Sequence, residues 1–398
     1  MEPRHLWEAD HTTRQNSHLT QYINWLNTSY RLNFSGDYEQ LHQWSIDHVE
    51  VFWESIWKYF NVINHRSYDR VTNGKKMPYT RWFLNSQINY AEHIFRNATD
   101  EFPALISKSE TRPTQEVSWQ ALEAQTAHLR EFFKESGIQT GDRIVGFLPN
   151  IPEATVSFLA TNSLGAIWSC CSPDFGIDSI LDRFSQINPK ILIAVDGYQY
   201  GGKPFDRMEV IAAVKEKIPS LEKVIIIPYL SHEENISSIG DYIHWNTIFD
   251  GPVPELRFTP VDFNHPMWVL YSSGTTGNPK AITHSHGGML LEHFKYLAFH
   301  NDVHRGERFF WYTTTGWMMW NFVQASLLCG ATAVLYDGNP AFPNLEVLWD
   351  FAEKAEIHHF GTSAPYIVAC MKADIHPGRQ HTFKKLRSIG STGAPLPP

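Results

Sequence analysis

Short apolar runs alternate with segments of helical periodicity along the chain from about residue 117. The runs have the length of buried strands and read RIVGFLP, AIWSCC, ILIAV and VIII, at 143–149, 166–171, 191–195 and 224–227. Between the second and third runs, one face of a helix is marked by Ile177, Ile180, Leu181, Phe184 and Ile187. Ser118 and Gly137 are suited to begin and end an earlier helix. This alternation predicts an α/β fold with largely parallel sheets covered by helices.

The length of 398 residues predicts more than one packed unit, because single cores stop growing below that size. A polar stretch at 231–246 and a proline-bearing stretch at 251–260 interrupt the alternation. Strand-like runs then resume at 267–271, 309–312, 332–336 and 357–360. We therefore predict a first α/β subdomain at 101–262 and a second at 263–398.

Residues 1–100 have a different composition, rich in Trp, Tyr, His and Asn. Trp53, Ile56 and the pair Tyr59 and Phe60 fall at helical spacing, and no clear strand pattern is present. Aromatic stripes of this kind are more often packing surfaces than functional sites. The segment is predicted to be a mostly helical cap lying on the larger body.

Composition excludes several classes of function. The net charge of −9 and the lack of Lys and Arg clusters argue against a nucleic-acid partner. The four cysteines show no CxxC spacing, and Cys170 and Cys171 lie in an apolar run that predicts small buried hydrophobes. The N-terminus lacks an apolar signal region, and no apolar run approaches the ~18 residues of a membrane helix. A cytoplasmic protein without membrane contact is expected.

The stretch YSSGTTGNPK at 271–280 combines glycines, hydroxyl side chains and a lysine directly after an apolar run. Glycine allows a backbone to approach a ligand closely, and hydroxyls, backbone N–H groups and a cation suit phosphate oxygens. The spacing is not the Walker pattern, and Pro279 lacks an N–H donor, so phosphates would be held less tightly than in a Walker loop. The stretch favours a phosphate-binding loop, with a structural turn as the alternative.

The same ten residues closely resemble the signature loop of the adenylate-forming superfamily, which contains acyl-CoA synthetases, luciferases and adenylation domains. Segments similar to other motifs of that superfamily lie at 141–176, 313–321, 360–367 and 391–398. VEVFWESIWKYF at 49–60 resembles the acetyl-CoA synthetase group, and LWEAD with the segment 76–95 fits its acetoacetyl-CoA synthetase branch best. The resemblance implies a helical cap and two αβαβα-type subdomains. It also implies a further C-terminal part with a small domain and a catalytic lysine, so the chain is expected to be an inactive fragment.

The resemblance implies a two-step reaction. A carboxylate attacks the α-phosphate of magnesium-bound ATP to give an acyl-adenylate and pyrophosphate, and the thiol of coenzyme A then displaces AMP. Acetoacetate is the expected acid, and acetate, propionate or butyrate are the alternatives. A nucleotide-binding module without turnover is the alternative outside the enzyme class. The sequence does not indicate an oligomeric state.

The resemblance also assigns roles to individual residues. The expected catalytic residues are Thr276 and Lys280, with Thr276 near the magnesium ion that enters with ATP. The expected contacts to nucleotide are Ser272, Ser273, Gly274, Thr275, Gly277, Gly393, Ala394 and Pro395, and Lys203 is expected at a phosphate of coenzyme A. The expected acid pocket contains Trp317, Met318, Met319 and Thr392. The alternatives are a solvated loop lysine for Lys280, a surface lysine for Lys203 and a core residue for Trp317. The histidine pairs at 284–286 and 358–359 lack metal-ligand spacing, so no other metal is expected.

Overall fold

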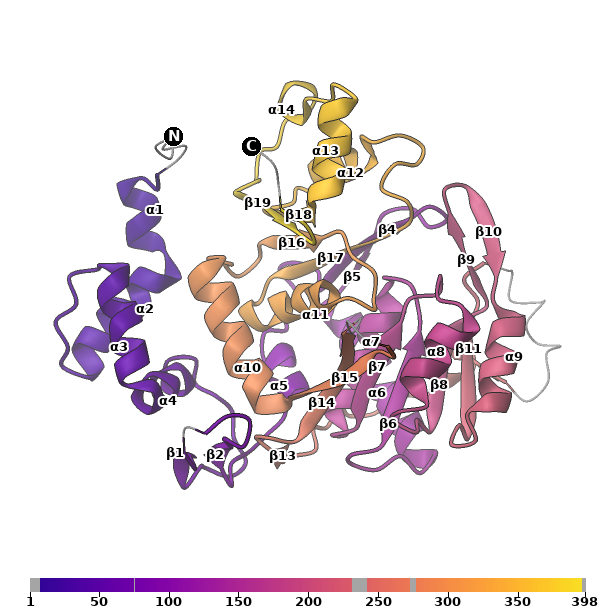
Figure 1. The fold of residues 1–398 in the computed structure, drawn as a ribbon, viewed down its shortest axis with the longest axis horizontal. Coiled ribbons are helices and arrows are strands. Elements are labelled where there is room, and N and C mark those ends of the chain that lie inside the picture. The colour runs from indigo at the N-terminus through magenta and orange to yellow at the C-terminus, as the bar shows by residue number, and fades with distance from the viewer. Residues whose placement is uncertain (1–7, 75, 231–241, 273–276, 396–398) are drawn as a thin grey trace.

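Two mixed sheets with covering helices form the body of the protein (Figure 1) in a computed structural model that describes residues 8–74, 76–230, 242–272 and 277–395. The predicted α/β fold is confirmed. The first sheet has seven strands in the order β12 (Ile243–His244), β11 (Lys223–Ile227), β8 (Ile191–Val195), β6 (Arg143–Phe147), β7 (Ile167–Cys171), β14 (Pro266–Ser272) and β15 (Lys280–Ser285). Neighbouring strands are parallel except for the antiparallel pair β14 and β15.

The first sheet is buried on both faces because its central strands are apolar at nearly every position. Ile144 packs in one core with the helices α6 (Trp119–Glu135) and α7 (Pro152–Ser163), while Val145 packs in another with α8 (Ile177–Phe184) and α9 (Met208–Lys217). Successive strand residues face opposite sides, so a continuous apolar run covers both. Helix α6 begins after Ser118, whose side chain accepts a hydrogen bond from the N–H of Ala121, as the sequence predicted.

The second sheet has six strands in the order β19 (Ser388–Thr392), β18 (His359–Ser363), β16 (Arg308–Trp311), β17 (Thr332–Asp337), β4 (Leu105–Ser109) and β5 (Gln115–Val117). All neighbours are parallel except β4 and β5. The helices α12 (Val347–Lys354) and α13 (Ala364–Lys372) pack on one face, followed by the short α14 (Pro377–Gln380). The helices α11 (Met318–Ala325) and η4 (Ser326–Cys329) pack on the other.

Each sheet contains strands from both sides of the predicted boundary near residue 262. The hairpin of β14 and β15 completes the first sheet, although it follows that boundary. The strands β4 and β5 complete the second sheet, although they precede it by more than a hundred residues. The two sheets therefore do not follow the division into 101–262 and 263–398.

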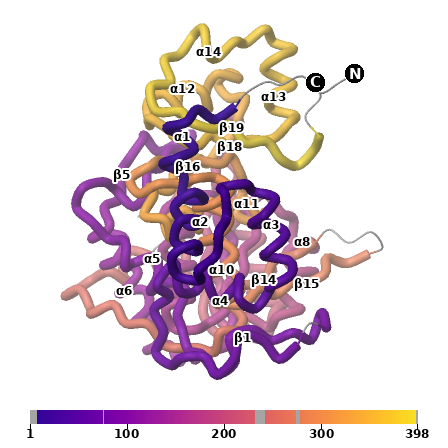
Figure 2. Tube along the Cα trace, turned by 90° about the vertical axis from the view of Figure 1, so that its left-hand side faces the viewer, coloured from indigo at the N-terminus to yellow at the C-terminus, as the bar shows by residue number. Residues whose placement is uncertain are grey.

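The N-terminal segment packs on the side of the body formed by α10 (His286–Lys295) and η3 (Tyr296–His300), a short π-helical segment (Figures 1 and 2). It contains the helices α1 (His11–Asn16), α2 (His18–Ser29), α3 (Tyr38–Asp47) and α4 (Val49–Tyr59). The ring of Tyr22 stacks on Phe299 at 4.5 Å, and that of Phe60 stacks on Phe294 at 4.6 Å. The aromatic stripe is thus a packing surface, in keeping with its sequence pattern.

The expectation that residues 1–100 lack strands was wrong. Two short antiparallel pairs occur: β1 (Arg70–Thr72) with β2 (Trp82–Leu84), and β3 (Gln87–Ile88) with β13 (Val261–Asp262). Strands of two or three residues are too short to show an alternating pattern. The remaining described elements are α5 (Tyr90–Phe95), η2 (Trp245–Phe249) and the hairpin of β9 (Gly197–Tyr200) and β10 (Lys203–Asp206).

Two features of composition have structural counterparts. The four cysteines are free thiols, and Cys170 and Cys171 are buried in the core. Among the helices of the described residues, none is both long enough and apolar enough to span a bilayer.

Three buried histidines, one on α5 and two on α10, are held in the neutral form. Nε2 of His93 accepts a hydrogen bond from the N–H of Ile63 at 2.9 Å, and Nδ1 of His286 accepts one from the N–H of Tyr90 at 3.2 Å. The third is His293. Burial, which disfavours the charged imidazolium, lowers the pKa of each from 6.5 to about 3.

We expect the fold to lose stability as pH falls from about 6.5 toward about 3. The unfolded chain binds protons in this interval that the folded chain excludes, so each histidine lowers the free energy of unfolding by about 1.4 kcal/mol per pH unit. Asp337, whose pKa is raised by burial to about 7, offsets one of the three. Denaturant unfolding at several pH values measures the slope.

The control is His42→Gln, a change at an exposed position of α3 that should leave the slope unchanged. His286→Gln should reduce the slope by up to the contribution of one proton, about 1.4 kcal/mol per pH unit, whatever its effect on stability at neutral pH. A free energy of unfolding that stays flat in acid would contradict the assignment of neutral buried imidazoles.

Candidate functional site

The predicted phosphate loop lies at the turn of the hairpin formed by β14 and β15. Ser272, the last residue of β14, pairs with Lys280, the first residue of β15, and the Lys280 side chain is exposed. Ser273, Gly274, Thr275 and Thr276 lie outside the described residues. Gly277 has φ of 148°, a value that disfavours any side chain there. The loop therefore has a rigid strand on each side.

The hairpin is fastened to α8 beside it. The side-chain amide of Gln186 donates to the carbonyl of Pro279 at 2.8 Å, and the hydroxyl of Tyr271 donates to the carbonyl of Arg183 at 2.8 Å. Within the hairpin, the indole N–H of Trp268 donates to Nδ1 of His284 at 2.8 Å. These bonds hold both strands in place next to the loop.

A cavity of about 450 Å³, named here the α10–β19 cavity, contains three of the four residues predicted for an acid pocket. Met318, Met319 and Thr392 line it, together with residues of α10 and η3. Trp317 does not line it, because this residue precedes α11 and its side chain is 66% exposed. Because its side chain is exposed, the alternative of a buried core tryptophan at this position is wrong, whereas its place in the acid pocket stays a prediction.

The tryptophan that does line the α10–β19 cavity is Trp311, at the end of β16. Its indole lies across β18 and β19, where a Cβ on Gly361 would approach it to 2.0 Å and one on Gly390 to 2.5 Å. Both positions must therefore be glycine for the ring to lie there. Trp311, His293 and Phe322 were not predicted as pocket residues, since a strand residue and two buried helix residues resemble ordinary core.

The predicted nucleotide segment follows directly from the wall of this cavity. Thr392 ends β19, and the exposed residues Gly393, Ala394 and Pro395 come next, Gly393 at φ of 88°. The residues predicted for an acid pocket and for a nucleotide are thus adjacent at the carboxyl end of a parallel strand, which is where α/β sheets commonly bind ligands.

A second cavity of about 260 Å³, named here the β9–β10 cavity, lies where strands of both sheets end. Its walls include Ser172 after β7, Thr313 after β16 and Gly338 after β17, and the hairpin side chains Tyr198 and Tyr200. Lys203 starts β10 on the same hairpin and is exposed, but it does not line the cavity. Lys203 is therefore connected to this cavity only through the hairpin that carries it.

Comparison with known proteins gives the family. The profile of the AMP-binding enzyme family matches residues 94–398, and that of the acetyl-coenzyme A synthetase N-terminus matches residues 38–94. The chain belongs to the AMP-binding enzyme family. The family resemblance predicted from the loop and its flanking motifs is confirmed.

Individual relatives are similar over nearly the whole of this chain. The acetoacetyl-coenzyme A synthetase of Rhizobium meliloti (strain 1021) is 39% identical over 99% of this chain and 60% of the relative. The acetoacetyl-CoA synthetase of Gallus gallus is 37% identical over 100% of this chain and 60% of the relative. The solved structure of acetoacetyl-CoA synthetase from Streptomyces lividans has a TM-score of 0.95 and 43% identity, covering 99% of this chain and 61% of that chain. This chain spans about 60% of the length of the curated relatives it matches.

Glu110 fastens the β9–β10 hairpin to the second sheet. Its carboxylate accepts hydrogen bonds from the N–H groups of Gly201, Gly202 and Asn339, each at 2.8 Å. Gly201 and Gly202 form the two-residue turn with φ of 61° and 75°, which suits the twist of a tight hairpin. One side chain therefore connects the hairpin turn to the loop after β17.

Asp337 lies in the same region and lines the β9–β10 cavity. Burial, opposed by a 2.7 Å hydrogen bond from the hydroxyl of Tyr229, raises its pKa to about 7. This carboxyl therefore keeps its proton to higher pH than an ordinary aspartate does. Sequence reasoning missed it, because an aspartate at the end of a strand carries no sign of its burial.

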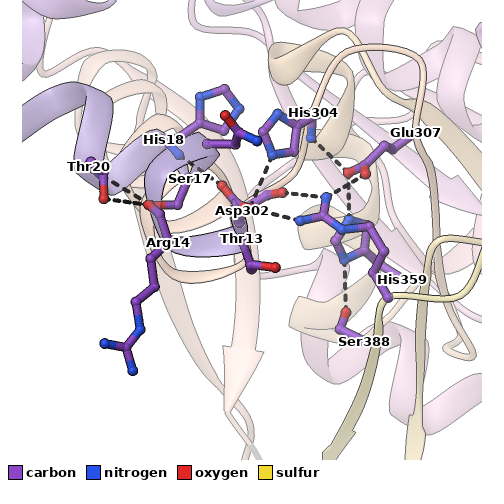
Figure 3. A network of polar contacts seen from close by, with 12 residues as sticks. Thr13, Arg14, Ser17, His18, Thr20, Asp302, His304, Glu307, His359 and Ser388 are labelled. Atoms are coloured by element: carbon purple, nitrogen blue, oxygen red, sulfur yellow. Dashed lines mark hydrogen bonds and ion pairs between the residues drawn. The ribbon is translucent and has the colours of Figure 1, made fainter. Parts of the chain in front are cut away.

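A polar network connects the cap with the strand that carries Thr392 (Figure 3). Asp302 accepts hydrogen bonds from the backbone N–H of His18 at 2.9 Å and from Arg387 at 2.8 Å, and it pairs with His304 at 3.1 Å. Arg387 also pairs with Glu307, which accepts from His359 at 2.8 Å. This network therefore fixes the position of Arg387, the residue immediately before β19.

The network is an ion-pair cluster in which the charges are mutually satisfied. Burial opposes the ionisation of Glu307, but hydrogen bonds from His359, the N–H of His304 and Arg387 outweigh it and hold the pKa of Glu307 at about 2. His18, Asp302 and His304 also offer three potential metal-ligand atoms within 4.8 Å. The imidazole rings of His18 and His304 stack with their centroids 4.3 Å apart, however, and Asp302 already pairs with Arg387. Internal pairing therefore accounts for the cluster.

We expect Glu110→Ala to lower the free energy of unfolding by roughly 1–3 kcal/mol, because three N–H groups lose their acceptor. The matched control is Glu116→Ala on the exposed edge strand β5, which should have little effect. Thermal and denaturant unfolding of the two variants measures the difference. Equal stability of both variants would show that Glu110 does not fasten the hairpin.

Proposed function

We propose that the full-length gene product is an AMP-forming acid–CoA ligase that activates acetoacetate. The observation that carries this proposal is the adjacency of acid-pocket and nucleotide residues on β19. Met318, Met319 and Thr392 line one cavity, and the predicted nucleotide segment starts at the residue after Thr392. The names of the relatives, acetoacetyl-CoA synthetase in each of those compared above, support the choice of acid.

In the first step, a carboxylate oxygen of the acid attacks the α-phosphorus of ATP, and pyrophosphate leaves with the electrons of the broken P–O bond. The attack requires acid and phosphate to be held in line while negative charge on the phosphates is offset. Lys280 at the start of β15 supplies a positive charge beside the predicted loop. Magnesium enters as part of the substrate with ATP, and the hydroxyl of Thr276 is its proposed neighbour.

In the second step, the thiol of coenzyme A attacks the acyl carbon and AMP leaves. A route for this substrate is offered by the β9–β10 cavity, where strands of both sheets end. The aromatic side chains of Tyr198, Tyr200 and Phe205 on the hairpin give it an apolar wall. Lys203 is exposed on the same hairpin and is the proposed partner of a phosphate group.

The proposed activity is tested by acid-dependent release of AMP from ATP by the full-length gene product. A panel of short carboxylic acids is compared, and acetoacetate is expected to give the highest kcat/KM. Activity with none of the acids would contradict the proposed ligase function, while a clear preference for acetate or propionate would contradict only the proposed acid.

Lys280→Ala and Thr276→Ala are each expected to lower acid-dependent pyrophosphate exchange on the order of 10²-fold, the usual cost of one lost charge-stabilising contact. The fold should be retained, because the Lys280 side chain is exposed. Lys217→Ala, at an exposed position of α9, is the control and should leave exchange unchanged. Near-normal exchange in both loop variants would reject the phosphate-loop assignment.

A further inference from the structure

His293 is a buried polar group in the wall of the α10–β19 cavity. It lies on α10, is 2% exposed, and lines the cavity together with Met319 and Thr392. Its Nδ1 is 2.8 Å from the hydroxyl oxygen of the fully buried Tyr90. Its Nε2 is buried without a hydrogen-bond partner among the described residues. A buried nitrogen without a partner beside a cavity is the arrangement expected of a group that bonds to a ligand.

The hydrogen bond from Tyr90 fixes which nitrogen of His293 carries the proton. Burial raises the pKa of Tyr90 well above its usual value, so its hydroxyl stays protonated and needs an acceptor. Nδ1 of His293 is the acceptor within reach. A neutral imidazole that accepts at Nδ1 carries its proton at Nε2. Burial also keeps the ring neutral by lowering the pKa of His293 to about 3. The free group beside the cavity is therefore an N–H donor.

The rest of the cavity wall mixes apolar and polar side chains. Met289, Met318, Met319 and Phe322 are apolar, while polar groups come from Glu292, Tyr296, Asn301, Ser391 and Thr392, with no Lys or Arg in the wall as far as the structure describes it. Asn301 also has a buried side-chain atom without a partner, but that atom is the amide oxygen, which cannot donate to a keto oxygen. Thr392 is exposed, so water can satisfy its hydroxyl whether or not a ligand is bound. A buried donor loses far more than an exposed one when its acceptor is missing.

We propose that His293 is the residue that selects a β-keto acid, by donating its Nε2–H to the keto oxygen of acetoacetate in the α10–β19 cavity. This inference rests on the proposed ligase function. Butyrate has the same carbon chain but no oxygen at that position, so it leaves the buried N–H unpaired. Discrimination by a lost hydrogen bond of this kind exceeds what a size difference alone can provide. Tyr90 acts as a positioning residue, because it sets the tautomer that donates.

The test compares kcat/KM for acetoacetate and butyrate in the full-length gene product and in two nearly isosteric variants. His293→Leu removes the donor, and His293→Gln keeps an N–H group. We expect His293→Leu to lower the acetoacetate-to-butyrate ratio by roughly 10- to 100-fold, mainly by lowering activity with acetoacetate. His293→Gln should retain part of the preference, and KM for ATP should be unchanged in both. Phe322→Leu, a change in an apolar wall residue, should affect the two acids alike.

Tyr90→Phe gives an independent test that leaves His293 in place. Without the hydroxyl the tautomer is no longer fixed, so the acid ratio should fall by a few-fold while KM for ATP stays constant. A purely structural role of Tyr90 would lower activity with both acids equally. An unchanged acid ratio in both His293→Leu and Tyr90→Phe, or in Tyr90→Phe alone if the former does not fold, would overturn this inference and leave the ligase function standing. Absence of AMP release with either acid in the unsubstituted protein would overturn both.

Discussion

The start of α5 is the point at which the cap, the first sheet and the α10–β19 cavity are joined by buried hydrogen bonds. The side-chain amide of Asn89 donates to the carbonyls of Asn162 at 3.0 Å and Thr259 at 2.9 Å, which belong to α7 and to the segment before β13. Tyr90 donates its N–H to His286 and its hydroxyl bonds to His293, both on α10. Apart from the partly buried Thr259, these residues are fully or almost fully buried, so an unmade bond would leave a polar atom without water.

This dependence explains why so polar a set of residues occupies the centre of the molecule. Replacing one partner would leave the other unsatisfied, whereas the complete set fixes α5 and α10 in a single arrangement. The neutral ring of His93 shows how one imidazole can do both, because its Nε2 accepts from the N–H of Ile63 and its Nδ1 bonds to the carbonyl of Asn89. The wall of the α10–β19 cavity is therefore held by the same bonds that hold the fold.

Local sequence patterns predicted the elements of the body but not their assembly. The apolar runs of β6, β7 and β8 and the cap of α6 by Ser118 depend on neighbouring residues, which a periodicity reveals. The placement of β4 in the second sheet depends on pairing with β17, more than two hundred residues away, for which no local pattern exists. Of the four residues that family motifs predict for an acid pocket, Met318, Met319 and Thr392 line the α10–β19 cavity and Trp317 does not. The ring that lines the cavity is Trp311, whose place depends on glycines in two other strands.

The two ends of the α10–β19 cavity suit the two ends of a short keto acid. His293 comes from α10, whereas Thr392 ends β19 and is followed by the predicted nucleotide residues Gly393 and Ala394. An acid whose keto oxygen is held at α10 has its carboxylate free to meet the nucleotide at β19. Since correct orientation of two reactants can remove ~7–11 kcal/mol from a barrier, a contact that fixes the far end of the acid contributes to rate as well as to selection. The polar network of Asp302, Glu307 and Arg387 then has a role of its own, because it fixes the start of the strand to which the nucleotide residues are attached.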